Sequence, residues 1–321
     1  MRVAGDQPRC YGKVMSQAPD HQNVSLTAWM LLALLALVWG GSYLSNRVAL
    51  EQVPVFTTVA FRVGGASLAL WIYVALRRLP VPLTPRLALA FLGMGILNNV
   101  IPFSLIVWGQ QHIPSGLAGI LNAATAVFSV LLAALIFADE RLTLNKGVGV
   151  LIGFLGVVIV VGLQTVGTVN IASLGQIAMI GAAVSYALSS SFAKITLRGV
   201  RPEVSAAGML TGASSVMVPL ALMTDGWPTL NYSGASWGAL AYLALMSSAF
   251  AYVIFYRILT LAGAGNLQLV TLLVGPVAVV LGALVYGESL ALNEYAGFAV
   301  IAFGLLIIDG RLPARLRAYF T

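Results

Sequence analysis

The sequence predicts an all-α polytopic membrane protein with ten transmembrane helices, because its composition and its apolar runs are those of membrane-spanning helices. Of the 321 residues, 60% are hydrophobic and 8% are charged, and the mean hydropathy is +0.94. About a quarter of the residues in a typical soluble domain are charged, so this composition excludes a soluble globular protein. Runs such as GVLIGFLGVVIVVG do not alternate between apolar and polar residues, which excludes the strands of a transmembrane β-barrel.

The predicted helices are apolar stretches long enough to cross a hydrocarbon core of about 30 Å, which needs roughly 20 helical residues. They cover residues 27–47, 55–76, 86–108, 114–137, 146–163, 173–195, 203–223, 235–257, 263–286 and 292–309. A polar N-terminal tail, residues 1–26, precedes them and lacks the charged-then-apolar order of a signal peptide. This tail holds Cys10, the single cysteine of the chain, so neither an internal disulfide nor a cysteine metal cluster is expected.

Basic residues indicate the orientation of the spans. The two tails and the loops after spans 2, 4, 6 and 8 hold 15 of the 17 Lys and Arg residues. The other two are Arg47, on the opposite side, and Arg62, inside span 2. Because basic segments are retained in the cytoplasm, we expect both termini, including the basic C-terminal tail of residues 311–321, to be cytoplasmic. A basic rim against anionic lipid explains the net charge of +7 without a nucleic-acid partner.

A polar phrase occurs twice in the chain, as DERLTLNKGVG at 139–149 and GESLALNEYAG at 287–297. Glu140 and Glu288, Asn145 and Asn293, and Gly149 and Gly297 are each 148 residues apart. The spacing predicts two five-span repeats, residues 27–164 and 173–310. Five is an odd number, so the second repeat enters the membrane from the opposite side. Such inverted repeats are the architecture of many secondary transporters, with the binding site at the repeat interface. An old duplication without a role in transport is the alternative.

Several short motifs stand within the predicted spans and at their ends. They are Trp39-Gly40-Gly41-Ser42 in span 1, Phe61-Arg62 in span 2, Glu140-Arg141-Leu142 and Glu288-Ser289-Leu290 at helix ends, and Gly275-Pro276 in span 9. With these motifs the chain resembles the drug/metabolite transporter superfamily. Within it, the chain is similar to the ten-span EamA-type branch, which includes bacterial amino-acid and metabolite exporters of the YddG kind. The resemblance covers about residues 27–310 and implies a multi-pass exporter of the bacterial inner (plasma) membrane.

One departure from the family concerns helix bending, for which Pro102 and Pro276 are the candidates. The first repeat has Thr125-Ala126 where the family often has a proline, as the second repeat does at Pro276. We therefore expect the paired helices of the two repeats to bend unequally.

Candidates for cargo binding are polar or aromatic residues that lie in mid-span and face other helices. They are Trp39, Ser42, Tyr43, Asn98, Asn99, Asn122, Tyr186, Ser189, Tyr252, Tyr256, Gln268 and Thr271, with Asn46, Thr125, Ser190 and Ser248 of the same kind. Tyr252 and Tyr256 are four residues apart and should line one helical face. Each candidate has a structural alternative, because Ser, Thr and Asn join helices by hydrogen bonds and Tyr or Trp anchors the membrane interface.

Three charged residues call for a separate interpretation. Arg62 lies roughly 10 Å inside span 2, where we expect it to orient a cargo carboxylate or to brace an outer gate; snorkelling to the surface is the alternative. Glu140 and Glu288 each end a long apolar helix at the water boundary. We expect each to cap the helix that follows it, or to compensate the positive end of that helix, rather than to bind cargo.

The sequence disfavours an enzyme. The chain has two histidines, His21 and His112, and lacks a His-Glu-x-x-His motif, an embedded pair of carboxylates and a Gly-x-x-x-x-Gly-Lys loop. Neither a metal nor a cofactor is expected.

We predict a secondary transporter that exports small metabolites, first among them amino acids or related neutral or zwitterionic compounds. Transport would occur by alternating access at a central cavity between the repeats. No span holds a central Asp or Glu, which disfavours carboxylate-coupled export of cationic drugs. The expected partners are cargo and membrane lipid, and the sequence is compatible with a monomer. A membrane channel or structural scaffold, and less so a polytopic membrane enzyme, are the alternatives.

Overall fold

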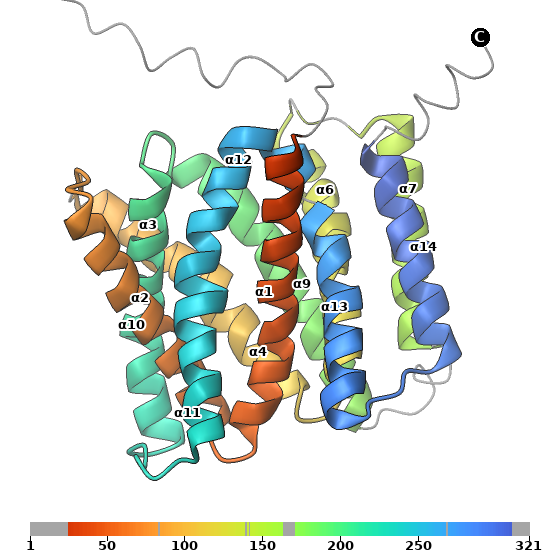
Figure 1. Cartoon of the computed structure of the whole chain (residues 1–321). Helices are drawn as coiled ribbons and strands as arrows, with labels where there is room; N and C mark the ends of the chain where they lie inside the picture. The colour runs from red at the N-terminus through yellow and green to blue at the C-terminus, as the bar shows by residue number, and fades with distance from the viewer. Residues whose placement is uncertain are drawn as a thin grey trace, which may run out of the picture.

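The computed structural model describes residues 25–82, 84–138, 140, 142–162, 171–267 and 269–309. These residues form ten helices long and apolar enough to cross a membrane, and none of them forms a strand, which confirms the predicted fold class. Successive spans run in opposite directions (Figure 1). We call the end of the bundle where the first helix begins the tail end, and the other end the far end.

Seven of the spans are single helices, and the other three are interrupted. The helices of the first half are α1 (Leu26–Leu50), α2 (Val55–Leu76), α3 (Pro85–Gly95), the π-helix η1 (Ile96–Val100), α4 (Ile101–Gly109), α5 (Ser115–Asn122), α6 (Ala124–Ile136) and α7 (Leu144–Val161). Those of the second half are α9 (Ile171–Thr196), α10 (Pro202–Thr224), α11 (Gly234–Ala241), the π-helix η2 (Tyr242–Phe250), α12 (Ala251–Leu267), α13 (Leu269–Tyr286) and α14 (Leu292–Asp309). Side-chain caps fix several starts: the hydroxyls of Ser25, Thr84 and Ser233 each accept a hydrogen bond from a backbone N–H three residues on.

Helices from the two halves of the chain pack against one another throughout the bundle. Helix α2 packs against α10, α1 and α5 against α13, α4 and α6 against α9, and α7 against α14. Figure 1 shows α7 and α14 side by side at one edge of the bundle, and α2, α3 and α10 towards the opposite edge. The buried apolar clusters therefore contain residues of both halves.

The contact between α7 and α14 depends on glycine. A Cβ on Gly149 would lie 2.7 Å from the carbonyl oxygen of Gly304, and a Cβ on Gly156 would lie 2.9 Å from that of Gly297. Gly149 and Gly297 are 148 residues apart, and so are Gly156 and Gly304. The two contacts therefore occupy equivalent positions in the two halves of the chain. Backbones approach this closely only where side chains are absent.

The π-helices correspond between the two halves, whereas the interruption of the fourth span has no counterpart in the ninth. Adding 148 to the residue numbers of η1 gives a range that lies within η2. The fourth span is interrupted at Ala123, between α5 and α6, and α12 has a kink at Gly263, where φ is 75°. Pro102 lies in the first turn of α4, directly after η1. The fourth span is interrupted without a proline, whereas α13 continues through Pro276.

Candidate cargo-binding site

Arg62 lies inside the bundle, about two turns from the start of α2. Its side chain is 5% exposed, so it does not snorkel to the surface. The Nε of Arg62 donates a hydrogen bond to Ser248 Oγ at 3.1 Å, and the guanidinium carbon lies 3.8 Å from the centre of the Phe103 ring. Three spans therefore hold this cation, namely the second, the third and the eighth.

The groups around Arg62 do not neutralise it. The ionisable side chains that interact with its guanidinium are phenols, those of Tyr43, Tyr186, Tyr242 and Tyr252. Within the part of the chain that the structure describes, no Asp or Glu lies within ion-pair distance of Arg62. A buried charge without a counter-charge is costly in a medium of low dielectric constant. The position therefore favours an anionic group from outside the protein.

A network of amide and hydroxyl groups joins the third span to the sixth and eighth. The amide of Asn98 donates to the Tyr252 hydroxyl at 2.9 Å and accepts from the Ser189 hydroxyl at 2.9 Å. The Tyr252 hydroxyl in turn donates to Asn99 Oδ1 at 3.4 Å. Asn99 is fully buried, and its Nδ2 has no partner among the described groups. Four predicted site residues, Asn98, Asn99, Ser189 and Tyr252, thus meet in one network.

The two π-helices supply backbone acceptors to neighbouring spans. Ser185 on α9 donates to the carbonyl of Leu97 in η1 at 2.7 Å. Trp39 on α1 donates through Nε1 to the carbonyl of Ser247 in η2 at 3.2 Å. A π-turn displaces carbonyls from their usual helical partners, which makes them available to side chains and explains why such turns are frequent at functional sites.

The Trp39-Gly40-Gly41-Ser42 motif forms an interface between α1 and the second half of the chain. A Cβ on Gly40 would collide with Val277 of α13, and one on Gly41 would lie 2.5 Å from the Tyr242 hydroxyl, which donates to the Val38 carbonyl. The Ser42 hydroxyl bonds to the Trp39 carbonyl of its own helix at 2.6 Å. Apart from Trp39, the motif is explained by packing.

The remaining candidates fall into two groups. Aromatic ones lie close to the network: the rings of Tyr252 and Tyr256 are 6.4 Å apart and stacked, Trp39 contacts Phe255, and Tyr186 packs against both large apolar clusters.

The polar candidates differ in their surroundings. Asn122 and Thr125 flank the interruption at Ala123, and each has a buried side-chain oxygen without a described partner. Thr271 lies in the third residue of α13, and the exposed Ser190 bonds to the Tyr186 carbonyl. Gln268 lies outside the described residues.

Gln110 is a buried residue that the sequence did not single out. It is 0% exposed, its Oε1 accepts from Asn46 at 2.8 Å, and its Nε2 donates to the Tyr43 carbonyl at 2.9 Å. Asn46, a cargo candidate by sequence, therefore has a structural partner. The neighbouring Gln111 is exposed, and nothing in the sequence distinguishes the two amides.

The glutamates at the helix ends do not cap the helices that follow them. Thr143 caps α7, and Glu294 accepts from the Ala291 N–H at the start of α14. Glu288 instead accepts from the Gly116 N–H in the first turn of α5, at 3.2 Å. Glu140 forms an ion pair with Lys194 near the end of α9. The capping expectation was wrong, because each glutamate follows a turn that brings it to a helix distant in sequence.

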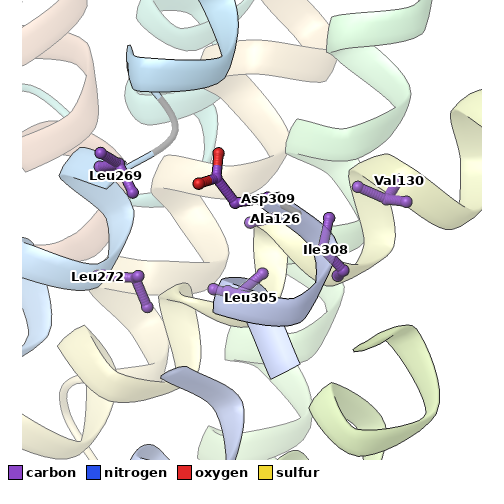
Figure 2. Close-up of a pocket in the computed structure, with 7 residues that line it drawn as sticks. All are labelled: Ala126, Val130, Leu269, Leu272, Leu305, Ile308 and Asp309. Atoms are coloured by element: carbon purple, nitrogen blue, oxygen red, sulfur yellow. The ribbon is translucent and has the colours of Figure 1, made fainter. Parts of the chain in front are cut away.

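An apolar cavity of about 280 Å³ opens between α6, α13 and α14 near the tail end (Figure 2). It is lined by Ala126, Val130, Leu269, Leu272, Leu305, Ile308 and Asp309. Of the predicted cargo residues that the structure describes, none lines it, and the residues of the polar network lie elsewhere.

Known proteins resemble this chain over nearly its whole length. The chain is 29% identical over 306 residues to a probable terminal-alkyne amino-acid exporter of Streptantibioticus cattleyicolor, which covers 93% of this chain and 98% of that protein. It is 28% identical over 289 residues to the uncharacterized inner membrane transporter YedA of Escherichia coli, covering 86% of this chain and 89% of YedA. These similarities and the ten apolar helices identify a multi-pass protein of the bacterial inner membrane.

A solved structure and a family model both match this chain. A solved crystal structure of a protein matches with a TM-score of 0.65 at 19% identity, covering 90% of this chain and 98% of that one. The model of the EamA-like transporter family matches twice, at residues 27–162 and 173–309. The chain therefore belongs to the EamA-like transporter family.

Proposed function

We propose that this transporter exports amino acids or related neutral or zwitterionic metabolites by alternating access to a site between its two halves. The observation that carries the proposal is the buried Arg62, which has no acidic partner among the described residues and lies beside amides and phenols. A secondary transporter needs one site that both sides of the membrane can reach in turn. The polar network joins both halves of the chain and has the composition of such a site.

The chemistry of Arg62 favours a carboxylate. A guanidinium offers planar pairs of N–H donors that match the two oxygens of a carboxylate. In this structure Nε is used by Ser248 and one face of the guanidinium covers Phe103. A cargo carboxylate would neutralise the cation, while the amides and hydroxyls of Asn98, Asn99 and Tyr252 would bond to its polar groups.

The charge balance of the site favours zwitterionic over cationic cargo. The described acids, Glu51, Glu140, Glu203, Asp225, Glu288, Glu294 and Asp309, lie in loops or in the first or last turns of helices. A cationic drug would therefore meet Arg62 without a compensating carboxylate. The name of the relative from Streptantibioticus, a probable amino-acid exporter, points to the same cargo class.

Inverted repeats, residues 27–164 and 173–310, form part of the proposal. The two family matches, the paired glycine contacts of α7 and α14, and the corresponding π-helices support them. The basic residues Arg77, Arg78, Arg198 and Arg201 lie at the tail end, which supports a cytoplasmic tail end.

Counterflow in proteoliposomes tests the function. Vesicles loaded with one unlabelled amino acid at a time receive the same labelled amino acid outside, with and without a pH gradient. We expect labelled amino acid to accumulate, and Arg62→Gln to reduce the initial rate about tenfold or more, because a hydrogen bond to a charged group contributes about 1.5–3 kcal/mol.

Two controls make the result specific. Arg257→Gln, which removes an exposed arginine at the tail end, should leave the rate unchanged, and Arg62→Lys should retain part of it. Folded protein that shows flux without counterflow would be a channel. A normal rate in Arg62→Gln would contradict the assigned role of the arginine.

A further inference from the structure

The tail-end cavity has a counterpart at the far end that is filled. Subtracting 148 from the cavity residues Leu269, Leu272 and Ile308 gives Leu121, Ala124 and Val160, and adding 148 to Val130 gives Ala278. These four counterparts are at most 1% exposed and belong to one buried cluster. Corresponding positions thus surround a cavity at one end of the molecule and a packed core at the other.

Helix contacts show the same difference. At the far end, α5 crosses α13 so closely that a Cβ on Gly119 would lie 2.6 Å from the Cβ of Ala278 and 3.5 Å from the Cα of Gly275. At the tail end, the side chains of α6 and α13 stand on opposite sides of the cavity (Figure 2). The seam between the fourth and ninth spans is closed at the far end and open at the tail end.

The two glutamates occupy different positions with respect to this seam. At the far end, Glu288 extends from the end of α13 to the Gly116 N–H of α5, and so bridges the closed seam. At the tail end, Glu140 follows α6 but bonds to Lys194 of α9, on its own side of the seam. The matching backbone across the seam begins after the kink at Gly263, because 148 residues separate Gly116 from Ala264.

The basic residues near the two glutamates also differ between the two ends. Arg47 at the end of α1 and Lys194 near the end of α9 are 147 residues apart. Lys194 binds Glu140, whereas Arg47 donates to the Gln110 carbonyl at 3.3 Å and lies 5.6 Å from the centre of the Tyr286 ring. Among the described residues, Arg47 forms no ion pair with Glu288.

We propose that Glu140 and Glu288 are alternating latches of this seam. Each has two partners: a base on its own side, Lys194 or Arg47, and the N-terminus of the helix across the seam. The structure then shows the far-end latch engaged and the tail-end latch released. The inference rests on the proposed alternating access between the two halves.

The opposite state follows from the correspondence between the halves. Glu140 would leave Lys194 and accept from the N–H groups after Gly263, while α6 and α13 close the cavity. Glu288 would leave Gly116 and pair with Arg47, and the core around Ala124 and Ala278 would open. Each state thus has one glutamate at a helix N-terminus and the other glutamate beside a basic residue.

Thiol labelling tests the latches without any cargo. The background variant is Cys10→Ser, which removes the only cysteine. Leu272→Cys reports on the cavity and Ala124→Cys on its filled counterpart, each in a separate protein. The full chain is placed in lipid nanodiscs, where both faces are accessible, and the rate of reaction with a polar maleimide is measured. In the background, Leu272→Cys should react faster than Ala124→Cys.

Two variants should shift these rates in reciprocal directions. Glu288→Gln weakens the engaged latch, so Ala124→Cys should react about fivefold faster and Leu272→Cys correspondingly slower, because a helix cap is typically worth that factor. Lys194→Met frees Glu140 to cross the seam and should have the same effect. The matched controls are Glu294→Gln, which alters a cap within one helix, and Lys146→Met at the tail end. Both controls should leave the two rates unchanged.

A third variant covers the case in which the others fail to fold. Ala126→Phe fills the cavity and so prevents the seam from closing at the tail end. The thiol of Ala124→Cys should then react as slowly as in the background, even when Lys194→Met is also present. Leu284→Phe, on an exposed position of the same seam helix, is its control. Unchanged rates in both latch variants, or a rise at both reporters, would overturn the proposal.

The outcomes separate this inference from the proposed function. Reciprocal shifts in a protein that shows no counterflow would support the latches and contradict the transport assignment. Normal counterflow, together with labelling rates that do not change in either latch variant, would contradict the latches alone.

Discussion

The amide nitrogen of Asn98 donates to the phenol oxygen of Tyr252 at 2.9 Å, although the two residues are 154 positions apart. The bond joins the π-helix of the third span to the eighth span, and so one half of the chain to the other. Any movement of the halves against each other must stretch or rotate this bond. A bond with this position links stability to the transport cycle.

A double-mutant cycle measures the link. Asn98→Ala and Tyr252→Phe should each lower thermal stability, and their combination should lower it by less than the sum, with a coupling of about 0.6–2 kcal/mol. The measurement is thermal unfolding in detergent, followed by intrinsic fluorescence. Tyr256→Phe is the control, because that ring stacks on Tyr252 while the Asn98 amide nitrogen donates to Tyr252 and Met209 instead. Additive effects of Asn98→Ala and Tyr252→Phe would disprove the coupling.

The contact between α7 and α14 should not tolerate a single methyl group. A Cβ at Gly156 would lie 2.6 Å from the backbone nitrogen of Ile301, so Gly156→Ala should destabilise the protein by about 1–3 kcal/mol. Gly64→Ala provides the comparison, because a Cβ there meets nothing within 4 Å and alanine favours the helix. Thermal unfolding of both variants checks this, and equal stability would show that the helices can separate freely.

Gln110 should contribute far more to stability than its neighbour. Gln110→Ala removes the partner of the Asn46 amide nitrogen and a second donor to the Tyr43 carbonyl, and a buried polar group left unpaired costs about 1–3 kcal/mol. The exposed Gln111→Ala should change stability by less than about 0.5 kcal/mol. Chemical unfolding in mixed micelles compares the pair. Similar losses from both would mean that this end of the bundle is open to water.

Thr125 offers a test that separates stability from transport. Its buried hydroxyl has no described partner, so Thr125→Val should leave stability unchanged or raise it by about 1 kcal/mol. A cargo group that bonds to this hydroxyl would lose that bond, so KM for counterflow should rise about tenfold. Thr196→Val is the control, because Thr196 bonds to the Phe192 carbonyl of its own helix. A variant with unchanged KM would remove Thr125 from the site.

Hydropathy predicted the spans because membrane insertion depends on local composition. Each span is apolar over enough consecutive residues to be recognised alone. The position of Arg62 inside the second span was predictable in the same way, because a charge in an apolar run is visible without knowledge of its neighbours. Its partners, Ser248 and Phe103, were not, because they come from other spans.

The parts that could not be predicted depend on contacts distant in sequence. Glu288 meets Gly116, which is 172 residues away, and no local pattern could reveal it. The two π-helices are equally hidden, because sequences such as ILNNV and YLALMSSAF are compatible with an ordinary α-helix. Gln110 and Gln111 are neighbours at the end of α4, and only the direction in which each side chain leaves the helix makes one buried and the other exposed.

The π-helices also fix the rotational register of the spans that contain them. A single inserted residue turns the rest of a helix by about 100°, so η1 determines which side of α4 faces α1. Deleting one residue from Ile96–Val100 would restore an α-helix and turn Gln110 away from Asn46, although the span would remain apolar. Length, more than residue identity, is what this segment must preserve.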